Sequence, residues 1–410
     1  MLWQKKFWPE RIIDAVQPIV ADGKVYLGSR EGTMYCLDEK DGKEVWAKRG
    51  FGPILFAAAC VDGKTIFGSL DGCVRALDGE TGKEAWKIPG PKGFTTAPLI
   101  AEGNVFIGSR GGTFFCIEPK HGRVLWQVDT QSYILQSAAY DDGKVYFGTE
   151  DCCMRAYEAK TGKLIWKSQP LYMQSMGPYA PVVHDGYVIF RCGWTQRTSW
   201  REEADLSKGS SWGIGKWAET FRNKEPLPAS FYEVQDELVK RLSKPGVREM
   251  YVLNAETGVE EFIVPHWPSN GSLGAGAPIP PPIVDADGLL VLTVVLHAGS
   301  GRGSAWGRLD LKKRRVVDVL VDPSKGSAFD QSKYVSAAGD LVFCFHISGT
   351  PWLAYQGVVH LPSRTWQPIP ACVGGTAGSG FTTQTGVGCA ISDGRVYHVE
   401  RNFLISRGWR

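Results

Sequence analysis

Four consecutive segments near the start of the chain share one pattern of alternating apolar and polar positions. The segments begin at Asp22, Asp62, Glu102 and Asp142 and follow one another without a gap. Within each, short alternating runs are separated by turns that contain glycine. Alternation with a period of two is typical of half-buried β-strands, and Asp-Gly pairs between such runs favour tight hairpins. Each segment is therefore predicted to form a four-stranded antiparallel sheet.

A tryptophan near the end of each segment fixes the repeat length. Trp46, Trp86, Trp126 and Trp166 are each 40 residues apart. Weaker copies of the pattern begin at Asp185, Asp287, Gly339 and Asp393, which makes eight units. A single sheet of this size cannot bury both of its faces, so neighbouring sheets must stack around an axis.

The two ends of the chain complement each other. The last unit stops before a fourth strand, whereas LWQKKF at residues 2–7 looks like a fourth strand without a unit, with Trp3 in the slot of Trp46. We therefore predict an all-β fold, an eight-bladed propeller over residues 1–410 as a single domain. We expect the N-terminal strand to complete the eighth blade and to close the ring, which removes exposed sheet edges.

Charge and hydropathy exclude two classes of partner. The net charge is only +3, so we expect no nucleic acid. The longest apolar run, residues 288–296, is strand-sized, so we expect no membrane span. The first ten residues lack the apolar segment of a secretory signal. The protein is expected to be periplasmic or secreted if a signal has been removed, and cytoplasmic if this N-terminus is native.

The segment ALDGETGKEAW at residues 76–86, with its variants in the neighbouring units, resembles the tryptophan-docking motif of pyrroloquinoline-quinone (PQQ)-like propellers. The resemblance implies the propeller fold but does not select a function, because the motif holds blades together. Relatives of this kind include quinoprotein dehydrogenases, outer-membrane assembly scaffolds and sensor domains of kinases.

The dehydrogenase resemblance implies a catalytic Asp, a calcium ion held by Glu and Asn, and a vicinal Cys pair near PQQ. Only the pair has a counterpart, Cys152-Cys153. Cys152 replaces a repeat glycine at a position that favours a positive φ. The pair could form a strained, redox-active disulfide or remain two thiols. We expect no bound PQQ with calcium, and no metal site, since no cysteine spacing is of the zinc type.

An insertion interrupts the fifth unit. The glycines that span 19 residues in the second unit, Gly63 and Gly82, correspond to Gly186 and Gly258, which span 72. Because the extra residues fall between the second and third strands, residues 191–247 are predicted to form a lid-like segment over the channel mouth. A short helix is expected in its second half. It would begin at a capping box of Ser230 and Glu233, carry an apolar stripe that runs from Phe231 to Leu242, and be stopped by Pro245-Gly246.

Candidate site residues gather on loops that should surround the same mouth. His297 and His346 end corresponding strands, and with Glu150 and Glu400 they are the candidate catalytic groups. The alternative for each histidine is a structural hydrogen bond to a loop. The candidate ligand-binding residues are Arg30, Arg110, Arg191, Trp194, Arg197, Trp306, Trp352 and Arg401. Tryptophans stack on sugar rings and arginines bind anions, although the tryptophans could equally form the core of the insertion.

Three functions fit these residues. The first is a non-catalytic module that binds a small-molecule or oligosaccharide ligand, including an anionic one, or a protein partner. The second is a carbohydrate-active lyase or hydrolase that uses the histidines and carboxylates. The third is a PQQ-dependent dehydrogenase. We favour binding, with the carbohydrate-active enzyme as the alternative.

Overall fold

The fold is described from a computed structural model. The residues that it describes are 1–7, 10, 16–173, 175–177, 179–192, 229–243, 248, 250–265, 282–298, 301–321, 333–346, 356–369, 389–400 and 403–408.

The described strands form eight antiparallel sheets, which we number as blades 1 to 8. Blade 1 contains β2 (Ile19–Ala21), β3 (Lys24–Gly28), β4 (Met34–Asp38) and β5 (Glu44–Lys48). Blade 2 contains β6 (Ala59–Val61), β7 (Lys64–Gly68), β8 (Cys73–Asp78) and β9 (Glu84–Pro89). Blade 3 contains β10 (Leu99–Ala101), β11 (Asn104–Gly108), β12 (Thr113–Glu118) and β13 (Arg123–Asp129). Blade 4 contains β14 (Ala139–Asp141), β15 (Lys144–Thr149), β16 (Cys153–Glu158) and β17 (Leu164–Lys167).

The second half of the chain continues the series. Blade 5 contains β18 (Val182–His184), β19 (Tyr187–Arg191) and β20 (Met250–Asn254). Blade 6 contains β21 (Ile283–Val284), β22 (Leu290–Ala298), β23 (Gly301–Asp310) and β24 (Arg315–Val321). Blade 7 contains β25 (Lys333–Ala338), β26 (Leu341–His346), β27 (Gln356–His360) and β28 (Thr365–Ile369). Blade 8 contains β29 (Ala390–Ser392), β30 (Arg395–Glu400), β31 (Phe403–Gly408) and β1 (Trp3–Lys6).

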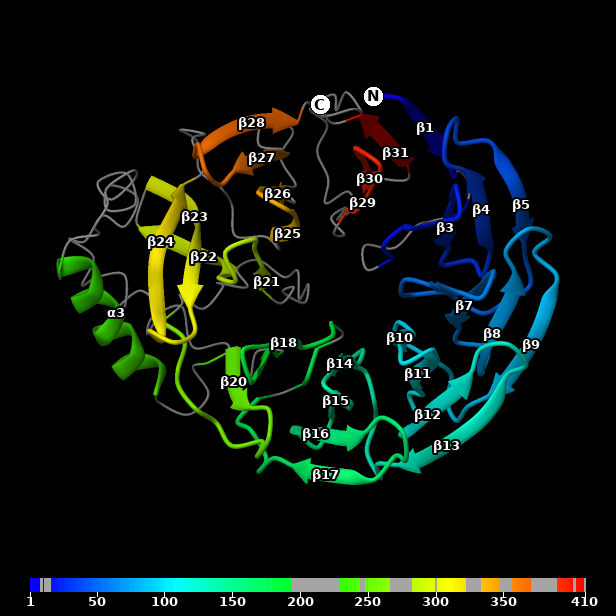
Figure 1. Ribbon diagram of the computed structural model, residues 1–410, viewed down its shortest axis with the longest axis horizontal. Helices are drawn as coiled ribbons and strands as arrows, with labels where there is room; N and C mark the ends of the chain where they lie inside the picture. The colour runs from blue at the N-terminus through cyan, green and yellow to red at the C-terminus, as the bar shows by residue number, and fades with distance from the viewer. Residues whose placement is uncertain are drawn as a thin grey trace. The chain divides into compact units, whose positions relative to one another are not determined.

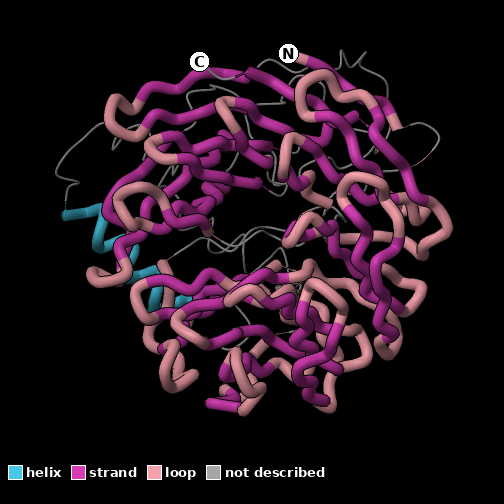
Figure 2. Tube along the Cα trace, turned by 45° about the vertical axis from the view of Figure 1, so that its right-hand side comes forward, coloured by secondary structure: helices cyan, strands magenta, loops and turns pink. Residues whose placement is uncertain are grey.

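This succession of sheets is an eight-bladed β-propeller, which confirms the predicted fold class. The chain divides into two compact units: blades 8 and 1 to 4 belong to the first, and blades 5 to 7 to the second. Within the first unit the innermost strands lie side by side in the order β29, β2, β6, β10 and β14 (Figure 1). Nearly all described secondary structure is strand (Figure 2).

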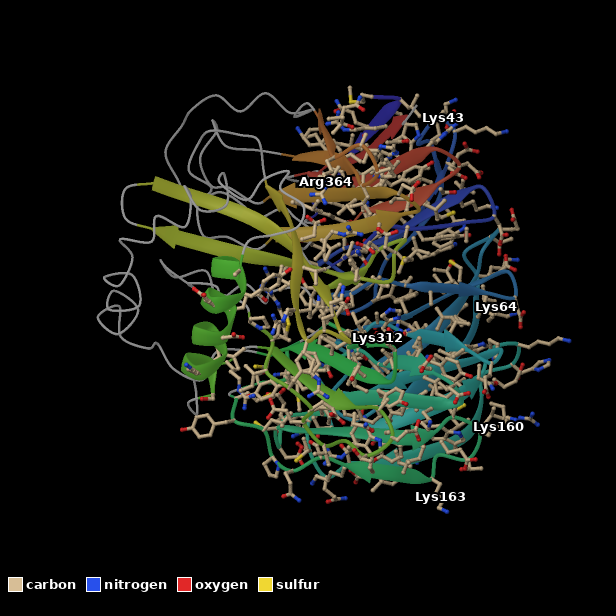
Figure 3. The ribbon with its side chains drawn as sticks, turned by 60° about the vertical axis from the view of Figure 1, so that its left-hand side comes forward. Lys43, Lys64, Lys160, Lys163, Lys312 and Arg364 are labelled. Carbon is tan, nitrogen blue, oxygen red and sulfur yellow. The ribbon has the colours of Figure 1, made fainter. Side chains whose placement is uncertain are left out.

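Asp-Gly turns join the first two strands of blades 1, 2 and 4, and Glu102-Gly103 takes this place in blade 3. In blade 1, Asp22 and Gly23 have φ angles of 50° and 70°, and Asp62 and Gly63 repeat this geometry in blade 2. Two consecutive left-handed residues are the requirement of a type I′ hairpin, which Asp-Gly meets at low cost. These turns and those between the third and fourth strands lie on one side of the first unit, where Figure 3 shows Lys43, Lys64, Lys160 and Lys163.

The repeat tryptophans fasten each blade to the next. The indole N–H of Trp46 donates to the carbonyl oxygen of Gly79 in blade 2 (3.0 Å), and the ring covers Gly82, where a Cβ would clash. Trp86 and Trp126 make the same pair of contacts one blade further on. Trp3 does so from blade 8, because its indole donates to Glu39 (3.0 Å) and covers Gly42 of blade 1.

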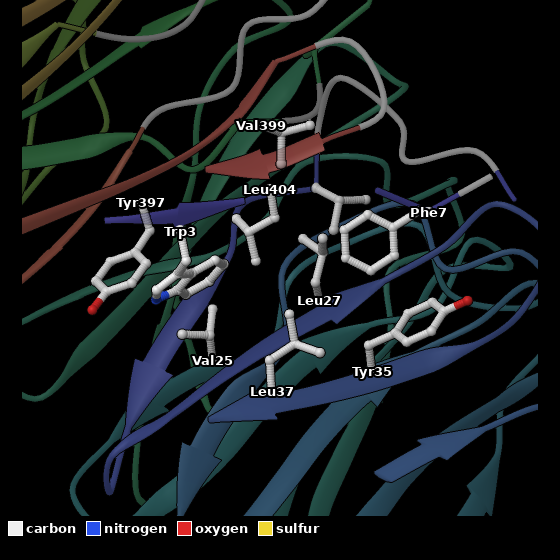
Figure 4. Packing of buried hydrophobic residues seen from close by; sticks show 10 residues of the cluster. Trp3, Phe7, Val25, Leu27, Tyr35, Leu37, Tyr397, Val399 and Leu404 are labelled. Atoms are coloured by element: carbon white, nitrogen blue, oxygen red, sulfur yellow. The ribbon is translucent and has the colours of Figure 1, made fainter. Parts of the chain in front are cut away.

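β1 therefore occupies the place of a fourth strand in blade 8. It pairs antiparallel with β31, so this sheet combines the two ends of the chain. Figure 4 shows Trp3 and Tyr397 of blade 8 packed over Val25 and Leu37 of blade 1 in a continuous apolar core.

Helix α3 (Ala229–Leu242) lies in the second half of the insertion. It packs against the outermost strand of blade 6, β24 (Figure 1). Gln235 is buried there, and its side-chain amide exchanges two hydrogen bonds of 2.8 Å with the backbone N–H and C=O of Val316. The helical part of the insertion thus covers a sheet edge, and residues 193–228 and 244–247 of the predicted lid lie outside the described residues.

No helix in the described part of the chain is long and apolar enough to cross a membrane.

Candidate functional site

Three of the predicted site residues, Arg30, Arg110 and Glu150, lie on the hairpins between the second and third strands of blades 1, 3 and 4. In blades 2 and 4 the hairpin carboxylate is neutralised from within the blade. Asp71 is bound by Arg75 (2.7 Å), and Asp151 by Arg155 (2.6 Å) and Lys167 (2.9 Å). Both arginines are buried on the third strand of their blade, so each ion pair ties the hairpin to the sheet.

The electrostatics of these two hairpins follow from that pairing. Burial alone would raise the pKa of Asp151, but hydrogen bonds from Arg155, Thr149 and Lys167 outweigh it and hold the pKa well below its ordinary value. The pKa of Asp71 is lowered in the same way by Arg75 and Ser69. Both carboxylates are therefore charged and already engaged, and neither is available as a proton donor or a ligand.

Blades 1 and 3 use the same slots differently. The third-strand positions of Arg75 and Arg155 hold Tyr35 and Phe115 there, both buried. Their hairpins instead carry Arg30 and Arg110, which are exposed. In the described part of the chain neither arginine has an ion-pair partner, so their charge is left for solvent or for a ligand.

Two residues from the loops between blades join Arg110. Lys92 lies in the loop before blade 3, and its ammonium group donates to the phenol oxygen of Tyr133 (2.7 Å) while sitting 4.4 Å from the ring centroid. Arg110 adjoins them, since its backbone N–H donates to the carbonyl of Gly93 (2.7 Å). The hydrogen bond and charge of Lys92, with a smaller contribution from Arg110, lower the pKa of Tyr133. We call Lys92, Arg110 and Tyr133 the basic cluster.

Glu150, a predicted catalytic group, has a structural contact. Its carboxylate accepts a hydrogen bond from the backbone N–H of Met176 (3.1 Å), in the loop that leaves blade 4. The contact holds the loop on the hairpin, as a structural carboxylate does.

The vicinal cysteines are thiols and form no disulfide with each other. Cys152 has a φ of 61°, at the position where Gly32, Gly72 and Gly112 have 84°, 101° and 101°, so the expected left-handed conformation is confirmed. Cys153 is buried, and its thiol donates to the carbonyl of Asp151 (3.5 Å). Burial, followed by the nearby carboxylates, raises the pKa of both thiols, which disfavours the reactive thiolate.

The remaining candidates fall in the second unit, in blade 8 or outside the described residues. Arg191 ends β19 and is buried, unlike Arg30 and Arg110. His297 is the penultimate residue of β22 and His346 the last of β26, so each stands near the end of the second strand of its blade, as expected. Trp306 lies on β23 and Glu400 ends β30. The side chains of these four lie outside the described part, as do Trp194, Arg197, Trp352 and Arg401 entirely.

The donor set for PQQ with calcium is not found among the described residues. There, no group of three or more His, Cys, Asp or Glu side chains could hold a metal ion. Among the described residues, Asp285, Asp287 and Asp318 surround the buried guanidinium of Arg308, and each of them forms an ion pair with it. The vicinal thiols hydrogen-bond to their own hairpin. These residues do not fit the cofactor.

Sequence reasoning missed Lys92 and Tyr133. Both lie in loops between blades, where the repeat fixes no residue type, so neither stood out as a departure from it. Their position in the repeat could have pointed to them. Residues 90–93 and 130–133 are 40 residues apart and precede blades 3 and 4 by the same number of residues, so both loops lie on the side of the blades that carries the hairpins.

The stacked four-stranded blades and their docked tryptophans define the class, a tryptophan-docked β-propeller. The chain is a PQQ-like eight-bladed propeller. The family model described as "Outer membrane protein assembly factor BamB" matches residues 1–93 and 70–201. No curated protein matches the sequence.

Solved structures share the fold at low identity. BamB from Moraxella catarrhalis is 14% identical, over 84% of this chain and 83% of that chain, with a TM-score of 0.53. Quinohemoprotein alcohol dehydrogenase from Comamonas testosteroni is 13% identical, over 98% and 76%, with a TM-score of 0.56. The computationally designed protein Ika8 is 14% identical, over 100% and 99%, with a TM-score of 0.57. Identities this low support the fold alone.

Proposed function

We propose that this protein is a binding module that takes an anionic ligand on the hairpin side of blades 1 to 3. The observation that supports this most strongly is the basic cluster. Lys92 and Arg110 stand together beside Tyr133, and in the described part of the chain no carboxylate neutralises either cation. The carboxylates on the neighbouring hairpins, Asp71 and Asp151, are each paired with a buried arginine of their own blade.

The chemistry of the cluster suits a carboxylate, sulfate or phosphate group. The guanidinium of Arg110 offers a planar pair of donors, Lys92 adds a point charge, and the exposed ring of Tyr133 offers a flat apolar face. Arg30 extends the same charge to blade 1. The two cations of the cluster can bind and orient an anion in this way, which supports a binding role.

A protein is a second source of such anionic groups. The matched family model carries the description of an assembly factor, and BamB of Moraxella catarrhalis shares the fold, so acidic side chains of a partner protein are the alternative ligand. The same comparison favours an exported protein of the periplasm.

A thermal-shift screen tests the proposal. The purified protein is heated with sulfated and uronate-containing oligosaccharides, matched neutral oligosaccharides, and PQQ with calcium. We expect the midpoint to rise with anionic compounds only, and the rise to disappear in Lys92→Gln and Arg110→Gln. Lys64→Gln, on the opposite side of the blades, is the matched control. A rise with neutral sugars, or one that both variants retain, would contradict an anion site at the basic cluster.

A further inference from the structure

The outer edges of the regular blades differ at one pair of positions. Just before each docking tryptophan, blades 1 and 2 carry Glu44-Val45 and Glu84-Ala85, whereas blades 3 and 4 carry Val124-Leu125 and Leu164-Ile165. Glu44 pairs with Lys5, and Glu84 with Arg75. The aliphatic residues of blades 3 and 4 are all exposed. Contiguous exposed apolar patches mark interaction surfaces, and here two adjacent aliphatic residues are exposed on each of two neighbouring blades.

A β-bulge explains why both members of each pair face solvent. The register of β13 against β12 shifts so that Val124 opposes Ile117 while Trp126 opposes Cys116, which leaves Leu125 as the extra residue. The same shift leaves Ile165 extra in β17. Bulges at an open edge disfavour the pairing of a further strand. A partner at this surface is therefore held through side chains and isolated backbone groups, and strand addition is disfavoured.

At the equivalent outer edge of blade 6, a helix covers a counterpart of the residues that are exposed on blades 3 and 4. Its bulge follows the same register, with Val316 opposite Leu309 and Asp318 opposite Arg308, so Val316 is the counterpart of Val124 and Leu164. Helix α3 lies over it, and Val316 is 3% exposed, against 36% for Val124 and 46% for Leu164.

Three contacts define how α3 recognises the edge of blade 6. Gln235 satisfies the outward-facing backbone N–H and C=O of Val316. Tyr232 packs on the apolar cluster that contains Val316. Arg315, the residue before Val316, stacks on the ring of Tyr232 (5.0 Å) and lies 3.9 Å from Asp236. An amphipathic helix thus contributes an apolar stripe, an amide and an acid.

Blades 3 and 4 present the complementary groups, and no helix in the described part of the chain covers them. Arg123 precedes Val124, and Lys163 precedes Leu164, as Arg315 precedes Val316. Both cations are exposed, and in the described part of the chain neither has an ion-pair partner. A second copy of this surface would bring like charges together, so charge complementarity favours an acidic partner.

We infer that the outer edges of blades 3 and 4 bind an amphipathic helix of a partner protein, one that carries an acidic residue beside its apolar stripe. This surface is separate from the basic cluster, and it stands or falls independently of the ligand proposed there.

The test uses a helix whose recognition of this kind of edge is already defined. A fluorescent peptide of residues 229–242 is stapled between positions 233 and 240, which are exposed in α3, because so short a helix is marginal in water. Its anisotropy is measured against the full chain. We expect saturable binding that weakens at least tenfold in the combined variant Val124→Glu and Leu164→Glu, which copies the acids of blades 1 and 2.

Two controls make the result specific. Val45→Glu alters an exposed apolar residue on blade 1, and we expect it to leave binding unchanged. A peptide with Asp236→Lys should bind at least tenfold more weakly, because it loses its pairing with Arg123 or Lys163. Unaltered thermal midpoints of the variants show that the fold is intact.

Three outcomes would overturn the inference: no saturable binding, equal binding to the combined variant, or equal binding of the Asp236→Lys peptide. Concentration-dependent dimerisation of the full chain that Leu164→Glu abolishes, without peptide binding, would assign the surface to a second copy instead.

Discussion

Alternate blades of the first unit use charge in opposite ways at equivalent positions. In blades 2 and 4 a buried arginine is tied to the carboxylate of its own hairpin. In blades 1 and 3 the buried position is aromatic, and an arginine stands exposed on the hairpin. The backbone is the same in both pairs. The difference teaches that the arginines of blades 2 and 4 tie their hairpins to the sheet, whereas Arg30 and Arg110 have no ion-pair partner in the described part of the chain and are available for the ligand that we propose.

The packing of blade 3 shows why its hairpin has no acid. Gly111 stands where Asp71 and Asp151 stand in the neighbouring hairpins, and a Cβ there would lie 2.5 Å from the side chain of Pro91. Its backbone N–H also donates to the carbonyl of Pro91 (2.8 Å). Tight contact with the preceding loop thus excludes the carboxylate that would otherwise neutralise Arg110.

The largest expected effect comes from breaking a buried ion pair. Arg155 is 3% exposed, so Arg155→Met removes the main partner of Asp151 from the interior. Loss of one member of a buried pair costs about 3–5 kcal/mol, and we expect about 2–3 kcal/mol because Asp151 keeps Lys167 and remains partly exposed to water. Urea denaturation measures the change.

Arg110→Met is the matched substitution on blade 3. We expect it to change stability by less than about 0.5 kcal/mol, as exposed positions do. If the two variants were equally destabilised, the division between structural and available charge would be wrong.

Acid should weaken the blades that carry the ion pairs. The pKa values of Asp71 and Asp151 are lowered in the folded state, so their contribution is complete above the unfolded pKa of about 3.9 and is lost as pH falls through the lower folded values. We expect the urea concentration at the unfolding midpoint of the unmodified protein to decrease once the pH is lowered below about 4. Arg155→Met should show a shallower fall, and an identical pH profile for the two proteins would count against the pairing.

Replacing Cys152 is expected to increase stability. Cys152 has a positive φ where the other blades have glycine, and a side chain in that conformation is strained. Cys152→Gly should therefore raise the free energy of unfolding by about 0.5–1 kcal/mol. Cys153→Gly, at a buried position with ordinary φ, should lower it. A loss of stability in Cys152→Gly would show that the thiol contributes packing that outweighs the strain.

The sequence repeat made the fold predictable, whereas the position of α3 and the contacts between loops could not be predicted from the sequence. Asp-Gly turns, the tryptophan slots and the left-handed position of Cys152 each follow from local chemistry that recurs every 40 residues. The amphipathic pattern predicted a helix at α3, but such a pattern names no surface, so its contact with β24 could not be foreseen. Lys92 and Tyr133 meet only through tertiary packing of two loops.

The most direct test of an uncompensated positive cluster is the pKa of Tyr133, measured by NMR of ¹³C-labelled tyrosine with Tyr133→Phe to assign the resonance. We expect a pKa below its ordinary value of 10.0, because Lys92 and Arg110 favour the phenolate. It should rise in Arg110→Gln, and also when sulfate is added to the unmodified protein, because a bound anion offsets the positive charge. A pKa at or above 10.0, or one that responds to neither change, would contradict the account.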